Sequence, residues 1–183
     1  MRAVLVLFEG LPATVIDSQV LAHVRLVLSW LAEPGVALRR LVRALKPGGC
    51  LVAEELDFQS LAVDPHLDAR TRSLFSTVAD AHLAILSAQH GFDPFYGRRM
   101  ARDLTAAGLV DVQAEGRTSM WHGGGQGGRV LKFTLVQLRE SIVAAGLAAS
   151  ADVDEIIKLC DEPRLSLVAP VTMAAWGHRP AVR

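Results

Sequence analysis

The 183-residue sequence has little cysteine, no net charge and no long apolar run. Its two cysteines, Cys50 and Cys160, show neither metal-ligand spacing nor a disulfide framework, so we expect both to be small buried hydrophobic residues. The 19 basic and 19 acidic side chains cancel, which gives no reason to expect binding to nucleic acid or to an anionic membrane. No apolar run reaches the length of about 18 residues that would predict a transmembrane helix.

The start of the chain lacks the features of a secretion signal. Residues 3–8 are apolar but too few for a signal-peptide core, and Glu9-Gly10 interrupts them. We therefore predict a cytoplasmic protein. Hydrophobic residues make up 51% of the sequence and charged residues 21%, which is typical of a globular domain with a substantial core.

Apolar periodicity and turn residues predict alternating strands and helices. The predicted strands are residues 20–24, 50–58, 109–120 and 165–176, and the predicted helices are 34–47, 65–89, 98–107, 129–145 and 152–159. A further apolar stretch, residues 2–8, fits either a short strand or a helical turn. Ser150 is the expected N-cap of the last helix. The early alternation predicts parallel strands joined by crossover helices, and hence an α/β fold.

Residues 38–55 carry the most specific pattern of the sequence. They read LRRLVRALKPGGCLVAEE: Pro47 stops a helix, Gly48 and Gly49 allow a tight turn, and an apolar strand follows that becomes acidic at its end. This segment resembles the helix–turn–strand signature before the fifth strand of class I S-adenosylmethionine (SAM)-dependent methyltransferases. Further stretches resemble other parts of that family in the correct order, namely 23–28, 97–109, 110–112 and 170–180.

The resemblance covers roughly residues 20 to 180 and implies a fold and a domain plan. The fold would be a truncated Rossmann-like sheet with strands equivalent to 4-5-7-6 of the family, helices on both faces and a helical insertion before the last strand. Residues 1–19 would be an atypical N-terminal segment with a possible substitute strand. Residues 20–183 would be the C-terminal half of the methyltransferase-like domain, with 129–160 as a helical cap insertion.

The opening of that fold has no counterpart in the sequence. The family begins with a strand, a G-x-G-x-G loop and a helix, and an acidic residue on the second strand then holds the ribose. Only about nineteen residues precede the match here, too few for three strands and their helices. We therefore expect a C-terminal half, whose first residues are either native or the product of a misplaced start or a frameshift.

A run of glycines at 123–128 imitates a cofactor loop. It reads GGGQGG and matches G-x-G-x-x-G at Gly123, Gly125 and Gly128. The strand predicted before it is polar, and glycine runs are typical of flexible linkers, so we favour a lid hinge for the inserted helices. The alternative is an unrelated α/β ligand-binding module built on this loop. No G-K-[ST] follows, which excludes a P-loop.

Candidate catalytic residues lie at the carboxyl end of strand 50–58, because ligands of open α/β sheets bind at the carboxyl ends of strands. Strand alternation places Glu55 and Asp57 on one face and Glu54 on the other. Glu55 and Asp57 are the catalytic candidates, and Glu54 is a candidate for binding the methyl acceptor. A solvated strand end without function is the alternative.

Candidate binding residues come from two further places. His23, Val24 and Arg25 end strand 20–24, where the resemblance places the methionine end of SAM, although a structural role for His23 fits equally well. Trp121 and His122 are candidates to line an acceptor pocket beneath the inserted helices, with core packing as the alternative for Trp121. No metal site is expected.

Two functions follow from the resemblance. The first is SAM-dependent methyl transfer to an unidentified small molecule. The second is a non-catalytic truncated domain that acts as a partner subunit or is a remnant, because without the glycine loop we expect no SAM binding by this chain alone. In the family order 3-2-1-4-5-7-6, loss of the first three strands makes strand 20–24 an apolar edge. We therefore expect residues 3–8 to pair with it, or two copies to form a homodimer through it.

Overall fold

The computed structural model describes residues 19–181, which fall into two compact units. Unit 1 comprises the described residues up to Asp57, the stretch Phe95–Arg117 and the chain from Thr172 onward, and unit 2 comprises Phe58–Pro94 and Thr118–Val171. Each unit has its own hydrophobic core. The expected substitute strand at residues 3–8 lies outside the described residues.

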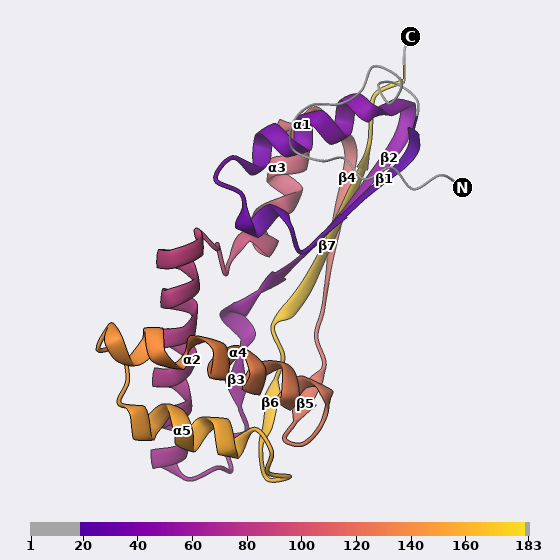
Figure 1. Ribbon diagram of the computed structural model, residues 1–183. Helices are drawn as coiled ribbons and strands as arrows, with labels where there is room; N and C mark the ends of the chain where they lie inside the picture. The colour runs from indigo at the N-terminus through magenta and orange to yellow at the C-terminus, as the bar shows by residue number, and fades with distance from the viewer. Residues whose placement is uncertain (1–18, 182–183) are drawn as a thin grey trace. The chain divides into compact units, whose positions relative to one another are not determined.

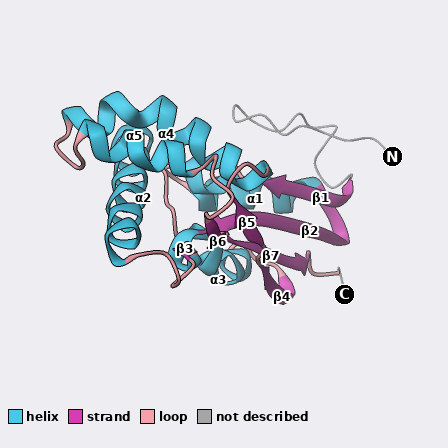
Figure 2. Ribbon diagram, turned by 90° about the horizontal axis from the view of Figure 1, so that it is seen from below, coloured by secondary structure: helices cyan, strands magenta, loops and turns pink. Residues whose placement is uncertain are grey.

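Unit 1 is built on a four-stranded sheet in the order β1-β2-β7-β4 (Figure 2). The strands are β1 (Gln19–Arg25), β2 (Leu45–Asp57), β7 (Val171–His178) and β4 (Val110–Arg117). β1 and β2 run parallel, whereas β4 and β7 run antiparallel. Numbered as in the family, this order is 4-5-7-6, so the predicted α/β class and strand order are confirmed.

Two helices cover the buried face of this sheet. α1 (Pro34–Ala44) and α3 (Met100–Ala106) contact each other, and α1 also contacts β1 and β2 while α3 contacts β4. From Gly49 to Asp57 every second residue of β2 is buried, and Leu51 and Ala53 pack in one core with residues of both helices. The resulting core includes Leu38, Leu41, Leu51, Ala53, Met100, Leu104 and Ala175.

The helix before the KPGG turn ends earlier than predicted. α1 ends at Ala44, and the turn forms the beginning of β2 rather than the end of the helix. Gly48 has a φ of +77°, which explains the glycine at this position. Its N–H donates to the carbonyl of Arg179 at 2.9 Å, and the N–H of Arg179 donates to Gly49 at 2.8 Å. The start of β2 therefore lies against the end of β7.

Unit 2 is a cluster of three helices beside a small second sheet (Figure 1). The helices are α2 (Ala69–His90), α4 (Gln126–Ala144) and α5 (Ser150–Leu159), and the sheet order is β3 (Ala62–Val63), β6 (Ser166–Val168), β5 (Met120–His122). All three helices bury apolar side chains in one core, which includes Phe75, Val78, Leu131, Leu135, Ile142, Val153 and Ile156.

Ion pairs join the helices of unit 2. Arg70 on α2 binds both carboxylate oxygens of Glu155 on α5. Arg139 on α4 binds both oxygens of Asp154 on α5, at 2.6 and 2.7 Å. The predicted cap helices 129–160 thus pack with α2 as one body. Ser150 is the first residue of α5, and Ala149, not Ser150, is its N-cap.

The prediction of single strands at 109–120 and 165–176 is wrong, because each segment forms two strands. β4 ends at Arg117 and β5 starts at Met120, while β6 ends at Val168 and β7 starts at Val171. The carbonyl of Ala169 accepts hydrogen bonds from the hydroxyls of Thr118 and Ser60, at 2.8 and 3.0 Å. Together with the backbone bond from the Ala169 N–H to the Ser119 carbonyl at 2.9 Å, these side-chain bonds hold the segments between the strands.

The described residues hold no helix long and apolar enough to cross a membrane. Within residues 19–181 there is also no group of three or more potential metal ligands. Cys160 is buried and Cys50 is partly exposed, and both are free thiols. Burial raises the pKa of Cys160 to about 12, so it remains a neutral thiol.

Candidate functional site

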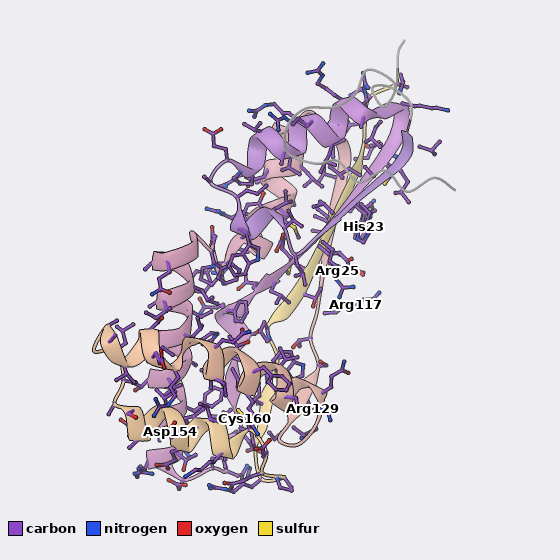
Figure 3. All side chains as sticks on the ribbon, viewed as in Figure 1. His23, Arg25, Arg117, Arg129, Asp154 and Cys160 are labelled. Atoms are coloured by element: carbon purple, nitrogen blue, oxygen red, sulfur yellow. The ribbon has the colours of Figure 1, made fainter. Side chains whose placement is uncertain are left out.

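Three predicted site residues meet at the carboxyl ends of β1 and β2. The imidazole Nε2 of His23 lies 2.8 Å from Oε2 of Glu54, and Nε of Arg25 lies 3.9 Å from the same oxygen. The side chains of His23 and Arg25 are 50% and 60% exposed, and that of Glu54 is 26% exposed. Figure 3 shows His23 and Arg25 along β1. The cluster is therefore accessible to a ligand.

The parallel register produces this cluster. Arg25 lies opposite Glu54 and His23 lies opposite Val52, so residues of the two strands with side chains on one face become neighbours. Val24 points the other way and packs against the core of unit 1. Beyond β1, Leu26 has a φ of +54° and donates its N–H to the carbonyl of Glu54 at 2.9 Å. This left-handed residue turns the chain sharply at the end of the strand.

Glu55 lies on the opposite face from Glu54, as predicted, and is held by protein donors. Its side chain is only 1% exposed. Oε1 accepts the backbone N–H groups of Val27, Leu28 and Ser29 at 2.7, 2.6 and 3.3 Å. Oε2 accepts the Ser29 hydroxyl at 2.8 Å. Glu55 thus caps the short helical turn Leu28–Trp30 from a distant strand.

Asp57 shares the face of Glu55 and is also paired. Arg98 donates from Nε and Nη2 to its two oxygens, each at 2.6 Å. The Asp57 side chain is 9% exposed, and the Arg98 guanidinium lies 5.1 Å from the centre of the Phe95 ring. Both predicted catalytic acids therefore have structural partners, whereas Glu54 pairs with an exposed histidine. A catalytic role for Glu55 or Asp57 stays a prediction.

Trp121 and His122 line a separate cavity in unit 2. The cavity has a volume of about 420 Å³. Strand β5, the residue before it and the first turns of α4 bound it. The lining residues are Ser119, Met120, Trp121, His122, Gly125, Gln126, Gly127 and Val130. Trp121 also packs against the core of unit 2. The acceptor-pocket and core-packing interpretations of Trp121 are thus both compatible with its position.

The glycine run beside this cavity is tied down and tightly packed. Gly123, Gly124 and Gly125 donate their N–H groups to Leu165, Cys160 and His122, at 3.0, 2.9 and 3.1 Å. A Cβ on Gly123 would lie 2.0 Å from the carbonyl oxygen of Glu162, so that position admits no side chain. These contacts are explained neither by a freely moving lid hinge nor by a cofactor loop that binds a phosphate. The glycines permit close packing of protein on protein.

Only the methionine end of SAM, and not its adenosyl end, has chemically matching side chains among the described residues. A carboxylate and an ammonium, as in its methionine part, are groups that Arg25 and Glu54 can bind through charge-assisted hydrogen bonds. For the adenosyl part, the one glycine run has its space filled by Glu162 and Trp121. Among the described residues, charged groups therefore match the methionine end of SAM, and no cradle matches its adenosyl end.

Comparisons with known proteins gave structural matches alone. No protein-family model matches the chain, and no curated protein matches it. Among solved structures, phosphoethanolamine N-methyltransferase 2 of Haemonchus contortus, in complex with SAM, matches with 12% identity and a TM-score of 0.44. The match covers 90% of this chain and 34% of that one, so the chain spans about a third of the enzyme's length.

Two bacterial structures match over more of their length. The YcgJ protein of Bacillus subtilis has 16% identity and a TM-score of 0.48, covering 95% of this chain and 69% of its own. A methyltransferase candidate from Bacillus halodurans has 11% identity and a TM-score of 0.46, covering 93% and 74%. Methyltransferases, the family that the motifs resemble, are thus among the matching chains. The strand order of unit 1 stands independently of these matches.

Sequence reasoning missed three residues of these sites. Ser29 and Arg98 were not singled out, although each binds a predicted acid. Gln126 was treated as part of a glycine linker, although it lines the cavity. For Arg98 a usable signal existed, since a strand-end aspartate that becomes buried requires a cation. Ser29 gave no such signal, because its contact with Glu55 depends on the turn made by Leu26.

Proposed function

We propose that this chain is a C-terminal portion of a class I SAM-dependent methyltransferase domain and that it serves methyl transfer to a small molecule. The observation that carries the proposal is the strand order β1-β2-β7-β4 with parallel β1 and β2 and antiparallel β7 and β4. That order coincides with the order expected from motifs that were read from the sequence alone.

Within this proposal, His23 and Glu54 have the most suitable position for proton transfer. The acceptor of a methyl group often has to lose a proton, and a histidine oriented by a carboxylate is a common general base. His23 is half exposed and bonded to Glu54 at 2.8 Å, whereas Glu55 and Asp57 are enclosed by donors. We assign Glu55 and Asp57 to positioning and His23 to the site itself.

The residues that would bind the amino-acid end of SAM are Arg25 and Glu54. SAM supplies the methyl group; what the chain contributes is a cation for the carboxylate and an acid for the ammonium. Because the adenosyl part lacks a cradle in the described residues, we predict that the chain alone binds neither SAM nor its demethylated product at about 100 µM. Isothermal titration of the purified chain tests this, and a micromolar dissociation constant would refute it.

A second candidate function is that of a partner subunit or a self-associating, non-catalytic domain. It is favoured by β1, which is an edge strand of the described sheet and leaves Val20 68% and Leu21 51% exposed. Parallel strands of this composition are normally covered on both sides. A homodimer through this edge is the arrangement we propose.

Size exclusion with light scattering over a hundredfold range of concentration tests the second candidate. Val20→Lys should shift the protein toward monomer, because a lysine on an edge strand blocks strand pairing. Val136→Lys is the matched control, since Val136 is 51% exposed on α4 and far along the chain from the edge. A monomer at every concentration, unchanged by Val20→Lys, would exclude self-association through β1.

A further inference from the structure

The cavity of unit 2 is lined by one histidine and by no other acidic or basic residue. Its eight residues are serine, methionine, tryptophan, histidine, glutamine, valine and two glycines, so no aspartate, glutamate, lysine or arginine contributes to it. A charged ligand would gain no ion pair with a carboxylate, lysine or arginine of this lining. The volume of about 420 Å³ lies in the range of sites for small organic ligands.

Trp121 gives the cavity a rigid aromatic wall. A Cβ on Gly127 would lie 2.1 Å from Cγ of Trp121 and 2.4 Å from Cδ2, so the indole rests directly on the Gly127 backbone. Any larger residue at 127 would displace the ring. An indole fixed in this way offers a flat surface against which another ring can stack.

The apolar wall continues to the mouth of the cavity. Two lining residues, Met120 on β5 and Val130 on α4, are 52% and 51% exposed. Phe133, about one turn after Val130 on α4, is 63% exposed. Exposed apolar side chains that adjoin a cavity mark a ligand-binding surface more often than a random surface.

Polar groups in the lining are few and suited to hydrogen bonding. The Ser119 hydroxyl, the His122 ring and the Gln126 amide line the cavity, and none of these side chains is engaged by another described residue. They can donate to or accept from a hydroxyl or an amine. A ligand that combines an apolar ring with one such group therefore matches the lining best.

We propose that this cavity binds an uncharged aromatic compound that carries a hydroxyl or amino group, with its ring against Trp121. That the compound is the methyl acceptor rests on the proposed function; that it binds in unit 2 does not. The lining residues all lie in the segment 119–130 of unit 2, so binding requires no SAM.

The test is an NMR titration of the ¹⁵N-labelled chain with 2-naphthol, a neutral aromatic alcohol. The three tryptophan indole signals are assigned by Trp→Phe substitution, since the chain has three tryptophans. We expect the Trp121 indole and the Gly125 and Gly127 amides to shift below about 1 mM ligand, and 2-naphthoate, which is charged, to bind about tenfold more weakly or worse. Unmoved Trp121 and glycine signals, or equal binding of the naphthoate, would overturn the proposal.

Two pairs of variants locate the site. Gly127→Ala should weaken binding about tenfold or more by displacing the indole, whereas Gly35→Ala, whose Cβ meets nothing closer than 3.4 Å, should leave it unchanged. Because Gly127→Ala can also destabilise unit 2, Met120→Glu provides a second variant at an exposed lining position, with Val136→Glu as its control outside the lining. Met120→Glu binding as tightly as Val136→Glu would contradict the proposed site.

The outcome is separable from that of the proposed function. If the chain binds 2-naphthol but a folded fusion of a glycine-loop half to the chain binds no S-adenosylhomocysteine, the cavity stands and the proposed methyltransferase falls. If such a fusion transfers methyl groups but its Trp121 signal is unmoved by 2-naphthol, the reaction stands and this acceptor class falls.

Discussion

Replacing Glu55 should destabilise unit 1 far more than replacing its neighbour Glu54. Glu55→Ala leaves the N–H groups of Leu28 and Ser29 and the Ser29 hydroxyl, all buried, without their acceptor. Each buried donor without a partner costs about 1–3 kcal/mol, so the three together give a loss of about 3 kcal/mol or more. That is a large share of the roughly 5–15 kcal/mol by which a domain is stable.

Glu55→Gln keeps one oxygen for the backbone donors and should cost less, about 1–2 kcal/mol, through loss of the charge on the acceptor. Glu54→Gln is the matched control, because Glu54 makes a partly exposed pair with His23. Such a pair is worth at most about 1 kcal/mol.

Urea unfolding followed by fluorescence measures these differences. In a Trp121→Phe background the remaining tryptophans, Trp30 and Trp176, both belong to unit 1. With a slope of about 2 kcal/mol per molar urea, Glu55→Ala should lower the midpoint by about 1.5 M. If Glu55→Ala and Glu54→Gln shifted the midpoint equally, Glu55 would not be the structural acceptor described here, and its catalytic candidacy would regain weight.

Three further predictions concern other contacts. Arg98→Ala should cost about 3 kcal/mol because it removes the two-pronged ion pair of the buried Asp57 carboxylate, whereas Arg102→Ala, at a position 71% exposed, should cost under about 0.5 kcal/mol in the same urea assay; equal effects would argue against the pair. Burial lowers the pKa of His82, which is 2% exposed, so the folded state keeps it neutral while the unfolded chain takes up a proton. The free energy of unfolding should therefore fall as pH drops below about 6.5, and His82→Gln should reduce that slope; an identical slope in the variant would show that His82 is not its source. In hydrogen exchange, the Gly123 and Gly124 amides should be protected because both are bonded to carbonyls, and exchange at the rate of an open loop would restore the hinge interpretation.

The strand order of unit 1 was predictable through the resemblance to class I methyltransferases, and the motifs that carry this resemblance are local. The KPGG turn, the apolar start of β2 and the acidic strand end each depend on few neighbouring residues. Alternation alone assigned Glu54 and Glu55 to opposite faces, and the structure confirms it. Which of them would be buried was not predictable, since that depends on α1 and α3 packing on one side of the sheet.

The second sheet and the glycine run were not predictable for a different reason. β3 and β6 are two and three residues long, too short for a periodic pattern, and they pair with residues far away in the chain. The glycines at 123–128 look like a flexible linker or a cofactor loop, because local sequence does not reveal what packs against them. In the structure Glu162 and Trp121 do so, which decides their role.

We propose that Arg25 and Glu54 bind the methionine end of SAM and that binding of the whole cofactor depends on a glycine-loop half. The most direct measurement is titration of S-adenosylhomocysteine into the chain and into a fusion in which the first three strand–helix units of a class I methyltransferase precede Val20. The account predicts no binding by the chain at about 100 µM, micromolar binding by the folded fusion, and a clear loss of that binding in the fusion carrying Arg25→Ala. Micromolar binding by the chain alone, or a folded fusion that does not bind, would contradict it.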